Sequence, residues 1–344
     1  MPAALAYPFA ARPEPATMTE VAPGVFWLRM PLPFALNHIN LWALEDEGGW
    51  TLVDTGLGDE VTRGLWAQLF APATGPLSGK PVRRLICTHF HPDHAGLAGW
   101  LTERFGIELW MTRAEWLFAR MLRSDTDATM VDDQVEFYRR AGAPAEYLDG
   151  VRRAGPTYAR RVAPIPRAYR RLRGGDEVAI GGRVWRVVIG LGHAPEHACL
   201  WCAGEKLLIA GDMVLPRISP NVGVWPNEPE ANPLAEFLDS LQGIRALPDG
   251  ALVLPSHNEP FRGLHERIDE LGRHHEERLD KLVSLIDAPK TAMEIARGLF
   301  TRPLDQHQTG FAIGETLSHL HMLRARGGAT RHADPDGIWR YERA

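Results

Sequence analysis

The sequence predicts an α/β (α+β) protein in which two stacked β-sheets are covered by helices on both sides, an αββα sandwich, followed by a small winged-helix domain. Strand and helix patterns alternate over residues 24–111, strand patterns return over 176–212, and residues 265–344 show three helices and a hairpin. These patterns predict a sandwich domain at 1–264, interrupted by a helical insertion at about 113–174, and a C-terminal domain at 265–344.

The N-terminal half carries the first set of predicted strands. Polar and apolar residues alternate from Gly24 onward, and the pattern breaks at a pair of glycines (48–49), which predicts strands joined by a hairpin. Helical spacing over 60–70 and 95–106 flanks a short apolar strand, RRLICTHF, at 83–90. This order of strand, helix, strand and helix is typical of an α/β protein.

The insertion has helical patterns and a marked division of charge. Residues 124–150 contain seven acidic and two basic side chains, whereas residues 151–175 contain eight arginines and no acid. The two segments could pair with each other as a solvated helical unit. Alternatively, the arginines could form the mouth of a site for an anionic substrate, because guanidinium groups suit carboxylates and phosphates.

A second set of strands follows the insertion. Two strand pairs are predicted at 176–193 and 197–212, each joined by a short turn that contains glycine. An amphipathic helix is predicted at 234–247, and a last buried strand, ALVLPSH, at 251–257. These strands supply the second layer of the sandwich.

The C-terminal segment has a different pattern. A long amphipathic helix at 265–287 precedes two further helical stretches, and DPDG at 334–337 marks a turn between two short strands. The third helix carries only Arg324 and Arg326 at its end, so DNA readout is not expected, while contact with single-stranded RNA remains open. Leucines at helical spacing predict that this helix packs on the sandwich domain or on a second subunit, as in a homodimer.

The composition excludes several classes of protein. The 344 residues include 38 Lys and Arg against 43 Asp and Glu, a formal net charge of -5, which gives no general attraction to nucleic acid or anionic membranes. No run of about 18 apolar residues could span a membrane, and residues 1–15 lack the pattern of a secretion signal. Three cysteines cannot form a disulfide framework, which favours a reducing compartment. Together these features lead us to expect a soluble cytoplasmic protein without membrane partners.

Three imidazoles and a carboxylate lie within the motif THFHPDH at 88–94, at the end of a buried strand. Alternate side chains of an extended segment point the same way, so His89 and His91 can hold one ion. The turn that follows directs Asp93 and His94 toward a second ion. Fourteen histidines in all make a metal site the first hypothesis, because neutral imidazole is the commonest metal ligand.

Further candidate ligands follow later strands. His193, Asp212 and His257 each come directly after a buried apolar run, which is where an open α/β sheet places its sites. Together with the first motif they complete two coordination shells. The seven histidines from His265 to His332 are predicted to be surface residues without a catalytic role.

The chain resembles the metallo-β-lactamase superfamily over roughly residues 20–262. The motif at 88–94 matches the H-x-H-x-D-H signature, and the three later ligand candidates occur in the order of its binuclear hydrolases. Asp54, in Asp-Thr-Gly, matches the strand-end Asp of the family. The layout with a C-terminal winged helix is similar to that of the β-lactamase-like endoribonuclease subfamily. This resemblance implies the sandwich fold and a binuclear metal site.

The resemblance also implies a role for each ligand. One zinc ion would be held by three imidazoles and the other by two imidazoles and a carboxylate, with a second carboxylate bridging: His89, His91 and His193; Asp93, His94 and His257; and Asp212. Two zincs about 3.5–4 Å apart would share a hydroxide nucleophile, since the metals lower the pKa of bound water toward ~7. Asp93 would orient the hydroxide and Asp54 would accept a hydrogen bond from a ligand imidazole. Iron or manganese can also occupy such a set.

The sequence departs from the common forms of the family in three places. GHAPEH at 192–197 replaces Gly-His-Thr-Pro-Gly-His and brings Glu196 near the site, to recognise a cationic or hydroxylated group or only to pair with an arginine. The interval between His94 and His193 is unusually long because it contains the insertion. The loop PSHNEP at 255–260 replaces a glycine-rich one.

Three other side chains are candidates for contacts around the metals or the substrate. His197 follows the ligand candidate His193 so closely that it could hydrogen-bond to a metal ligand and orient it. His38 could stand at the rim of the active site or belong to a plain surface turn. Trp225 could line the pocket or simply pack.

These features predict a metal-dependent hydrolase that cleaves a small ester, thioester or lactone. The arginines of the insertion could hold an anionic carrier such as a part of coenzyme A or glutathione. One alternative is an endoribonuclease acting on single-stranded RNA, as the resemblance in layout suggests. The other is a non-enzymatic regulatory module in which the metal site is a relic.

Overall fold

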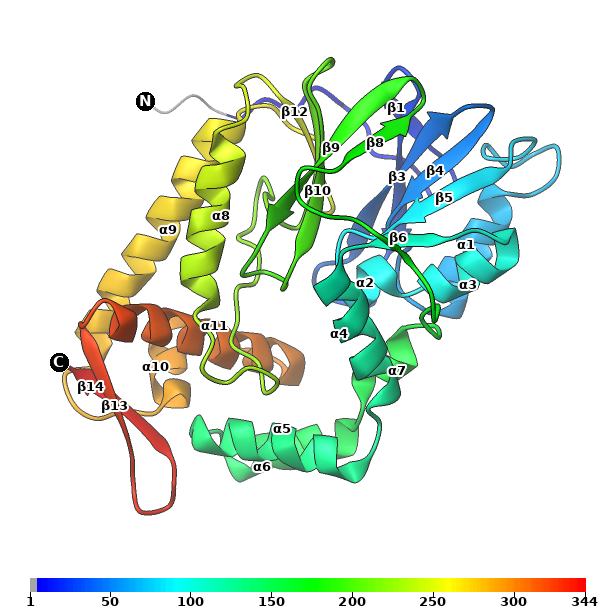
Figure 1. Cartoon of the computed structure of the whole chain (residues 1–344). Helices are drawn as coiled ribbons and strands as arrows, with labels where there is room; N and C mark the ends of the chain where they lie inside the picture. Colours follow the sequence, from blue (N-terminus) through cyan, green and yellow to red (C-terminus); the bar gives the residue numbers. More distant parts are fainter. Residues whose placement is uncertain (1–4) are drawn as a thin grey trace.

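Two facing β-sheets form the centre of the computed structural model, which describes residues 5–344 (Figure 1). The first sheet has seven strands in chain order, antiparallel from β1 to β4 and parallel from β4 to β7. They are β1 (Thr19–Ala22), β2 (Val25–Pro31), β3 (His38–Asp46), β4 (Gly49–Val53), β5 (Val82–Ile86), β6 (Leu109–Met111) and β7 (Arg170–Arg171). Of the segment predicted to lack a secretion signal, residues 1–4 lie outside the described residues.

The second sheet has five strands in the order β12-β11-β10-β9-β8, with β11 and β12 parallel and the others antiparallel. They are β8 (Glu177–Ile180), β9 (Arg183–Gly190), β10 (His197–Cys202), β11 (Leu207–Gly211) and β12 (Leu252–Pro255). Large side chains fill the space between the sheets. Trp27 and Trp42 of the first sheet and Trp185 of the second are fully buried in this layer.

Helices cover the outer faces of both sheets, which confirms the predicted αββα sandwich (Figure 1). The helices beside the first sheet are α1 (Glu60–Leu69), α2 (Pro92–Ala95) and α3 (Ala98–Phe105), and those beside the second are α8 (Pro233–Arg245) and α9 (Leu264–Leu285). The Asp59 side chain caps α1 by accepting a hydrogen bond from the Thr62 amide at 2.8 Å. Leu65, Trp66 and Leu69 then form the buried face that the helical spacing predicts.

The insertion folds into four helices that connect the two halves of the molecule. They are α4 (Arg113–Ser124), α5 (Ala128–Arg140), α6 (Ala145–Ala154) and α7 (Thr157–Arg161). Phe137 of α5 packs edge-on against Trp339 of the C-terminal hairpin, with ring centroids 6.1 Å apart. Within residues 5–344, Arg152–Asp149 is the ion pair that joins the arginine-rich and acidic segments, so the expected pairing between them is mostly wrong.

The C-terminal segment has the predicted order of helices and strands. After α9 come α10 (Ala292–Leu299), α11 (Gln306–Ala325), β13 (Ala329–Ala333) and β14 (Trp339–Arg343). Capping boxes begin α10 at Thr291 and α11 at Asp305. Helix α11 packs into the same core as α8 and the second sheet, as expected for contact with the catalytic domain.

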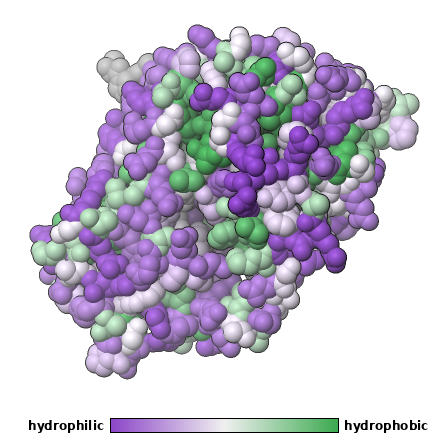
Figure 2. Space-filling view, viewed as in Figure 1, coloured by the Kyte–Doolittle hydropathy of each residue, from purple (hydrophilic) through white to green (hydrophobic). Residues whose placement is uncertain are grey.

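The prediction that the C-terminal histidines lie on the surface is wrong for three of them. His275, His319 and His321 are buried among α8, α9, α11 and the loop before α8. The helices here pack on several sides, so an imidazole on any face meets another element. The face shown in Figure 2 is mostly hydrophilic, and no helix in the described part of the chain is long and apolar enough to cross a membrane.

Candidate metal centre

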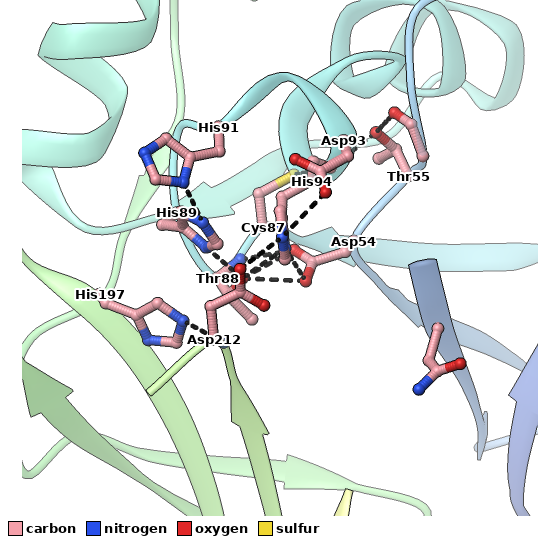
Figure 3. Close-up of polar contacts among 12 residues, drawn as sticks. Asp54, Thr55, Cys87, Thr88, His89, His91, Asp93, His94, His197 and Asp212 are labelled. Carbon is pink, nitrogen blue, oxygen red and sulfur yellow. Dashed lines mark hydrogen bonds and ion pairs between the residues drawn. The ribbon is translucent and has the colours of Figure 1, made fainter. Parts of the chain in front are cut away.

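Seven histidine and aspartate side chains converge at one edge of the sandwich, at the ends of strands from both sheets. They come from the loop after β5, the loop after β9, the end of β11 and the loop after β12: His89, His91, Asp93 and His94; His193; Asp212; and His257. The carboxyl ends of parallel strands meet at the same edge of a sheet, which explains why distant residues come together. Figure 3 shows the first loop facing Asp212.

Three imidazoles form the first group. The His89 Nε2 atom lies 2.9 Å from His91 Nδ1 and 3.2 Å from His193 Nε2. Burial and the neighbouring imidazoles hold the pKa of His89 and of His91 well below the ordinary value, so these rings are neutral, the form that binds a metal. His193 is fixed through Nδ1, which lies 2.8 Å from the Asn221 carbonyl oxygen.

Two imidazoles and a carboxylate form the second group. Asp93 Oδ2 lies 3.7 Å from His94 Nε2 and 3.5 Å from His257 Nε2. Burial lowers the pKa of His94, but the carboxylates of Asp93, Asp212 and Asp54 outweigh it and raise the pKa well above its ordinary value. The ring of His257 is oriented by Nδ1, which donates to the backbone carbonyl of His38 at 2.8 Å.

The Asp212 carboxylate stands between the two groups. Its Oδ2 atom lies 3.5 Å from His193 Nε2, 3.6 Å from His94 Nε2 and 3.4 Å from His257 Nε2. Burial disfavours the charged form, but His257 and His94 hold the pKa of Asp212 well below its usual value.

The residues present fit a metal site. Among the described residues, the buried His94 Nε2 and Asp212 Oδ1 atoms have no hydrogen-bond partner. Leaving buried polar atoms without partners costs about 1–3 kcal/mol each, so a ligand is expected at these atoms. Nitrogen and oxygen donors gathered from four loops are ligands that zinc, iron and manganese all accept.

Asp54 supports this centre from the loop after β4. Its Oδ2 atom lies 2.9 Å from His94 Nδ1, and its carboxylate accepts hydrogen bonds from the amide and hydroxyl groups of Thr88 (Figure 3). The residue has a φ of 62°, a left-handed conformation that non-glycine residues rarely adopt. The strand end thus places the carboxylate behind a ligand imidazole, as the resemblance implies.

His197 and His38 are both buried beside candidate ligands. The His197 Nε2 atom accepts a hydrogen bond from the Asp212 amide at 3.1 Å. The His38 Nε2 atom accepts one from the Asn258 amide at 2.8 Å. His38 is 6% exposed, so the interpretation as a plain surface turn is wrong, and its contacts fix the loop that carries His257.

Glu196 takes part in a contact with α4 that the sequence did not predict. Its carboxylate accepts a hydrogen bond from the Ala114 amide at 2.9 Å and lies 3.9 Å from the Arg171 guanidinium. Glu115 of α4 is fully buried and accepts hydrogen bonds from the amides of Phe90 at 2.9 Å and Glu196 at 2.6 Å. The only sequence signal for Glu115 is its place in the first turn of a predicted helix.

Trp225 lies where the C-terminal domain meets the loop after β11. The ring is half-buried and packs edge-on against Phe311 of α11, with centroids 5.7 Å apart. Phe311 also contacts the ring of His307, which stacks on Phe34. The sequence missed His307, because the leucine spacing of α11 predicts packing of the helix but does not show that His307 itself meets Phe34.

The stacked sheets and the cluster of histidines and aspartates define a metal-binding protein of the αββα class. Residues 36–257 match the family described as the metallo-beta-lactamase superfamily, and the chain belongs to this superfamily. Residues 279–344 match a second family, described as the metallo-beta-lactamase-like C-terminal domain.

Solved structures and curated relatives agree with this assignment. A beta-lactamase domain protein from Burkholderia ambifaria is 46% identical with a TM-score of 0.92, covering 99% of this chain and 98% of that one. A metallo-beta-lactamase family protein from Thermus thermophilus is 33% identical with a TM-score of 0.80, and the match covers 94% of this chain and 100% of that one. The probable metallo-hydrolase YqjP of Bacillus subtilis is 24% identical over 92% of this chain and 97% of its own length.

One further relative carries a named activity. The acyl-coenzyme A thioesterase MBLAC2 of Gallus gallus is 26% identical over 69% of this chain and 79% of its own length. The superfamily and its named hydrolases together support a hydrolase.

Proposed function

We propose that this protein is a metal-dependent hydrolase of small esters, thioesters or lactones, with thioesters as the first class to test. The observation that carries the proposal is the position of Asp212 Oδ2, 3.4–3.6 Å from imidazoles of both candidate ligand groups. A carboxylate shared in this way suits a two-metal site. The similarity to a named acyl-coenzyme A thioesterase supports the choice of thioesters.

The two groups would hold one metal ion each, and two zinc ions are the proposed complement. One ion takes the three imidazoles, the other takes two imidazoles and a carboxylate, and one carboxylate is shared: His89, His91 and His193; Asp93, His94 and His257; Asp212. When bound, such metals supply Lewis acidity and make water a nucleophile near neutral pH.

The chain itself supplies orientation and proton transfer. Asp93 has a 20% exposed side chain, against 9% for Asp212. Asp93 is therefore the carboxylate that can accept a proton from an attacking water and return it to the leaving group. Asp54 and the carbonyl groups of Asn221 and His38 fix the imidazole rings so that their other nitrogens face the centre.

The test is a panel of thioesters, esters and lactones given to zinc-loaded protein, with His89→Ala and Asp93→Asn variants as controls. The proposal expects turnover of at least one class, reduced about 10²-fold or more in Asp93→Asn because proton transfer is lost. Turnover no faster than in His89→Ala for every class would contradict it.

Two other results obtained with the same purified protein would replace the proposal with one of the alternative functions. Degradation of single-stranded RNA that is lost in Asp93→Asn, without turnover of small substrates, would indicate an endoribonuclease. Purified protein that retains almost no metal after incubation with zinc, iron and manganese would indicate a non-enzymatic module.

A further inference from the structure

Three segments that are far apart in the sequence meet beside the candidate metal centre. The guanidinium of Arg161, the last residue of α7, lies 4.9 Å from the ring centroid of Phe34. His307, in the first turn of α11, stacks on the same ring at 5.4 Å with planes 20° apart. The insertion, the loop between β2 and β3, and the C-terminal domain thus each contribute one side chain to what we call the Arg161 cluster.

Backbone contacts place the Arg161 cluster close to the ligand loops. The Arg161 carbonyl accepts a hydrogen bond from the amide of Gly58, just after the Asp54 loop, at 2.8 Å. Two residues on, the Ala163 amide donates to the carbonyl of Gly96 at 2.7 Å. Gly96 directly follows α2, the helix of Asp93 and His94.

The electrostatic environment of His307 agrees with this placement. Burial and the charge of Arg161 lower the pKa of His307, while Asp305 and Asp93 oppose the shift. The imidazole is therefore influenced by the charges of both Arg161 and Asp93.

The charge of Arg161 is not balanced by an acid. Within residues 5–344, no carboxylate forms an ion pair with its guanidinium, and burial together with Arg160 lowers its pKa. Two other arginines of the segment lie near acids: Arg152 pairs with Asp149, and Arg171 lies 3.9 Å from Glu196. A half-buried arginine without an acid is poised for an anion from outside the chain.

We propose that the Arg161 cluster binds an anionic group, a phosphate or a carboxylate, on the non-reacting part of the substrate. The guanidinium holds the anion, and the rings of Phe34 and His307 contact the adjoining organic portion. Because backbone hydrogen bonds join Arg161 to Gly58 and Ala163 to Gly96, directly after the helix of Asp93, an anion bound at the cluster would anchor a substrate whose acyl bond reaches the metals. This inference rests on the proposed hydrolase function and narrows its substrates to those with an anionic carrier.

The experiment measures binding, so it does not depend on turnover. Three thioethers that cannot be hydrolysed are titrated calorimetrically into zinc-loaded protein: S-methyl-coenzyme A, S-methyl-glutathione and the neutral S-methyl-N-acetylcysteamine. The first offers phosphates, the second carboxylates and the third no charge. Wild type is compared with Arg161→Met, with Arg161→Lys, and with the neighbour control Arg160→Met, whose native guanidinium donates to the Ala154 carbonyl.

We expect Arg161→Met to weaken binding of one anionic thioether about tenfold or more, the loss typical for a charged hydrogen bond. Arg161→Lys should recover part of this loss, while Arg160→Met and the neutral thioether should change less than about twofold. Whichever anion is affected identifies phosphate or carboxylate as the group recognised.

Equal binding of both anionic thioethers by wild type and Arg161→Met would overturn the inference. So would an equal loss for the neutral thioether, or a wild type that binds neither anion. Anion binding that depends on Arg161 without hydrolysis of the matching thioester would instead count against the proposed function alone. Unfolding midpoints of all variants verify that each protein is folded.

Discussion

The carboxylate of Glu115 accepts a hydrogen bond from the backbone amide of Glu196 at 2.6 Å. The Glu196 carboxylate in turn accepts one from the amide of Ala114, the residue before Glu115, at 2.9 Å. Glu115 also accepts from the amide of Phe90. One buried residue of the insertion therefore joins the loop of His89 and His91 to the loop of His193.

Because Glu115 holds these two loops together, we predict that Glu115→Ala lowers both the stability of the fold and the retention of metal. The variant leaves two buried amides without acceptors, at a cost of about 1–3 kcal/mol each. Burial raises the pKa of Glu115 to about 8, so a neutral side chain is tolerated and Glu115→Gln, which keeps one acceptor, should lose less. Urea unfolding and metal content after dialysis measure both effects. Equal stability of Glu115→Ala and wild type would show that the hydrogen bonds of Glu115 to the two loops do not stabilise the fold.

Removal of metal should destabilise the protein reversibly. The buried His94 Nε2 and Asp212 Oδ1 atoms have no partner in the described chain, so metal binding supplies interactions that the apoprotein lacks. At a metal concentration about 1,000 times the Kd, the stabilisation is about 4 kcal/mol. Calorimetric scans before and after chelation, and after zinc is restored, would measure it. An unchanged unfolding midpoint after complete chelation would argue against a metal at these atoms.

Helix α11 should control the orientation of His193 through the loop at 221–225. Gly314 approaches this loop so closely that a Cβ atom would lie 3.1 Å from the Val224 carbonyl oxygen, and the Val224 amide donates to the Gly314 carbonyl at 3.0 Å. Gly314→Val should displace the loop and the Asn221 carbonyl that orients His193, at a cost of about 1–3 kcal/mol.

The control for this prediction is the same change at Gly243 in α8, where a Cβ atom would meet nothing within 4 Å. Metal affinity and urea stability should fall in Gly314→Val and hold in Gly243→Val. If both variants bind zinc as wild type does, α11 has no influence on the ligand.

Acid should destabilise the packing of α9 against α11. His275 Nδ1 and His319 Nε2 lie 3.2 Å apart, and burial lowers the pKa of His275 to about 2 and that of His319 to about 4. Both values lie below the ordinary 6.5, so the unfolded chain binds protons first as the pH falls. The stability contributed by neutral imidazoles is complete above about pH 6.5 and is lost below it, by about 1.4 kcal/mol per pH unit for each ring.

Urea unfolding of wild type and His319→Gln between pH 7.5 and 5 tests this dependence. Between pH 6 and 5 the variant should lose about 1.2 kcal/mol less than wild type, because one titrating ring is absent. Identical slopes would contradict the assignment.

The convergence of the ligand candidates could be predicted from the sequence because each candidate directly follows a predicted strand. His89 and Asp212 follow short runs whose length and residue types favour buried strands, and parallel strands bring their ends to one edge. The sandwich followed from the same runs, since their strand and helix periods differ clearly.

Contacts made by helices from other parts of the chain could not be predicted. Glu115 looks like a solvated residue of an amphipathic helix, and its burial depends on where α4 meets two loops. His307 likewise gains its contact with Phe34 only when the C-terminal domain packs against the rest, and His275 meets His319 only when α9 and α11 pack together. Side-chain period within one helix does not reveal which distant element will cover it.

The most direct test of the central claim is the rate of thioester hydrolysis measured while zinc is titrated into metal-free protein. The two candidate ligand groups, with Asp212 between them, predict a rate that rises from near zero and levels off at about two zinc ions per chain, with no rise in His89→Ala. A rate that is the same in metal-free and zinc-loaded protein would contradict the account.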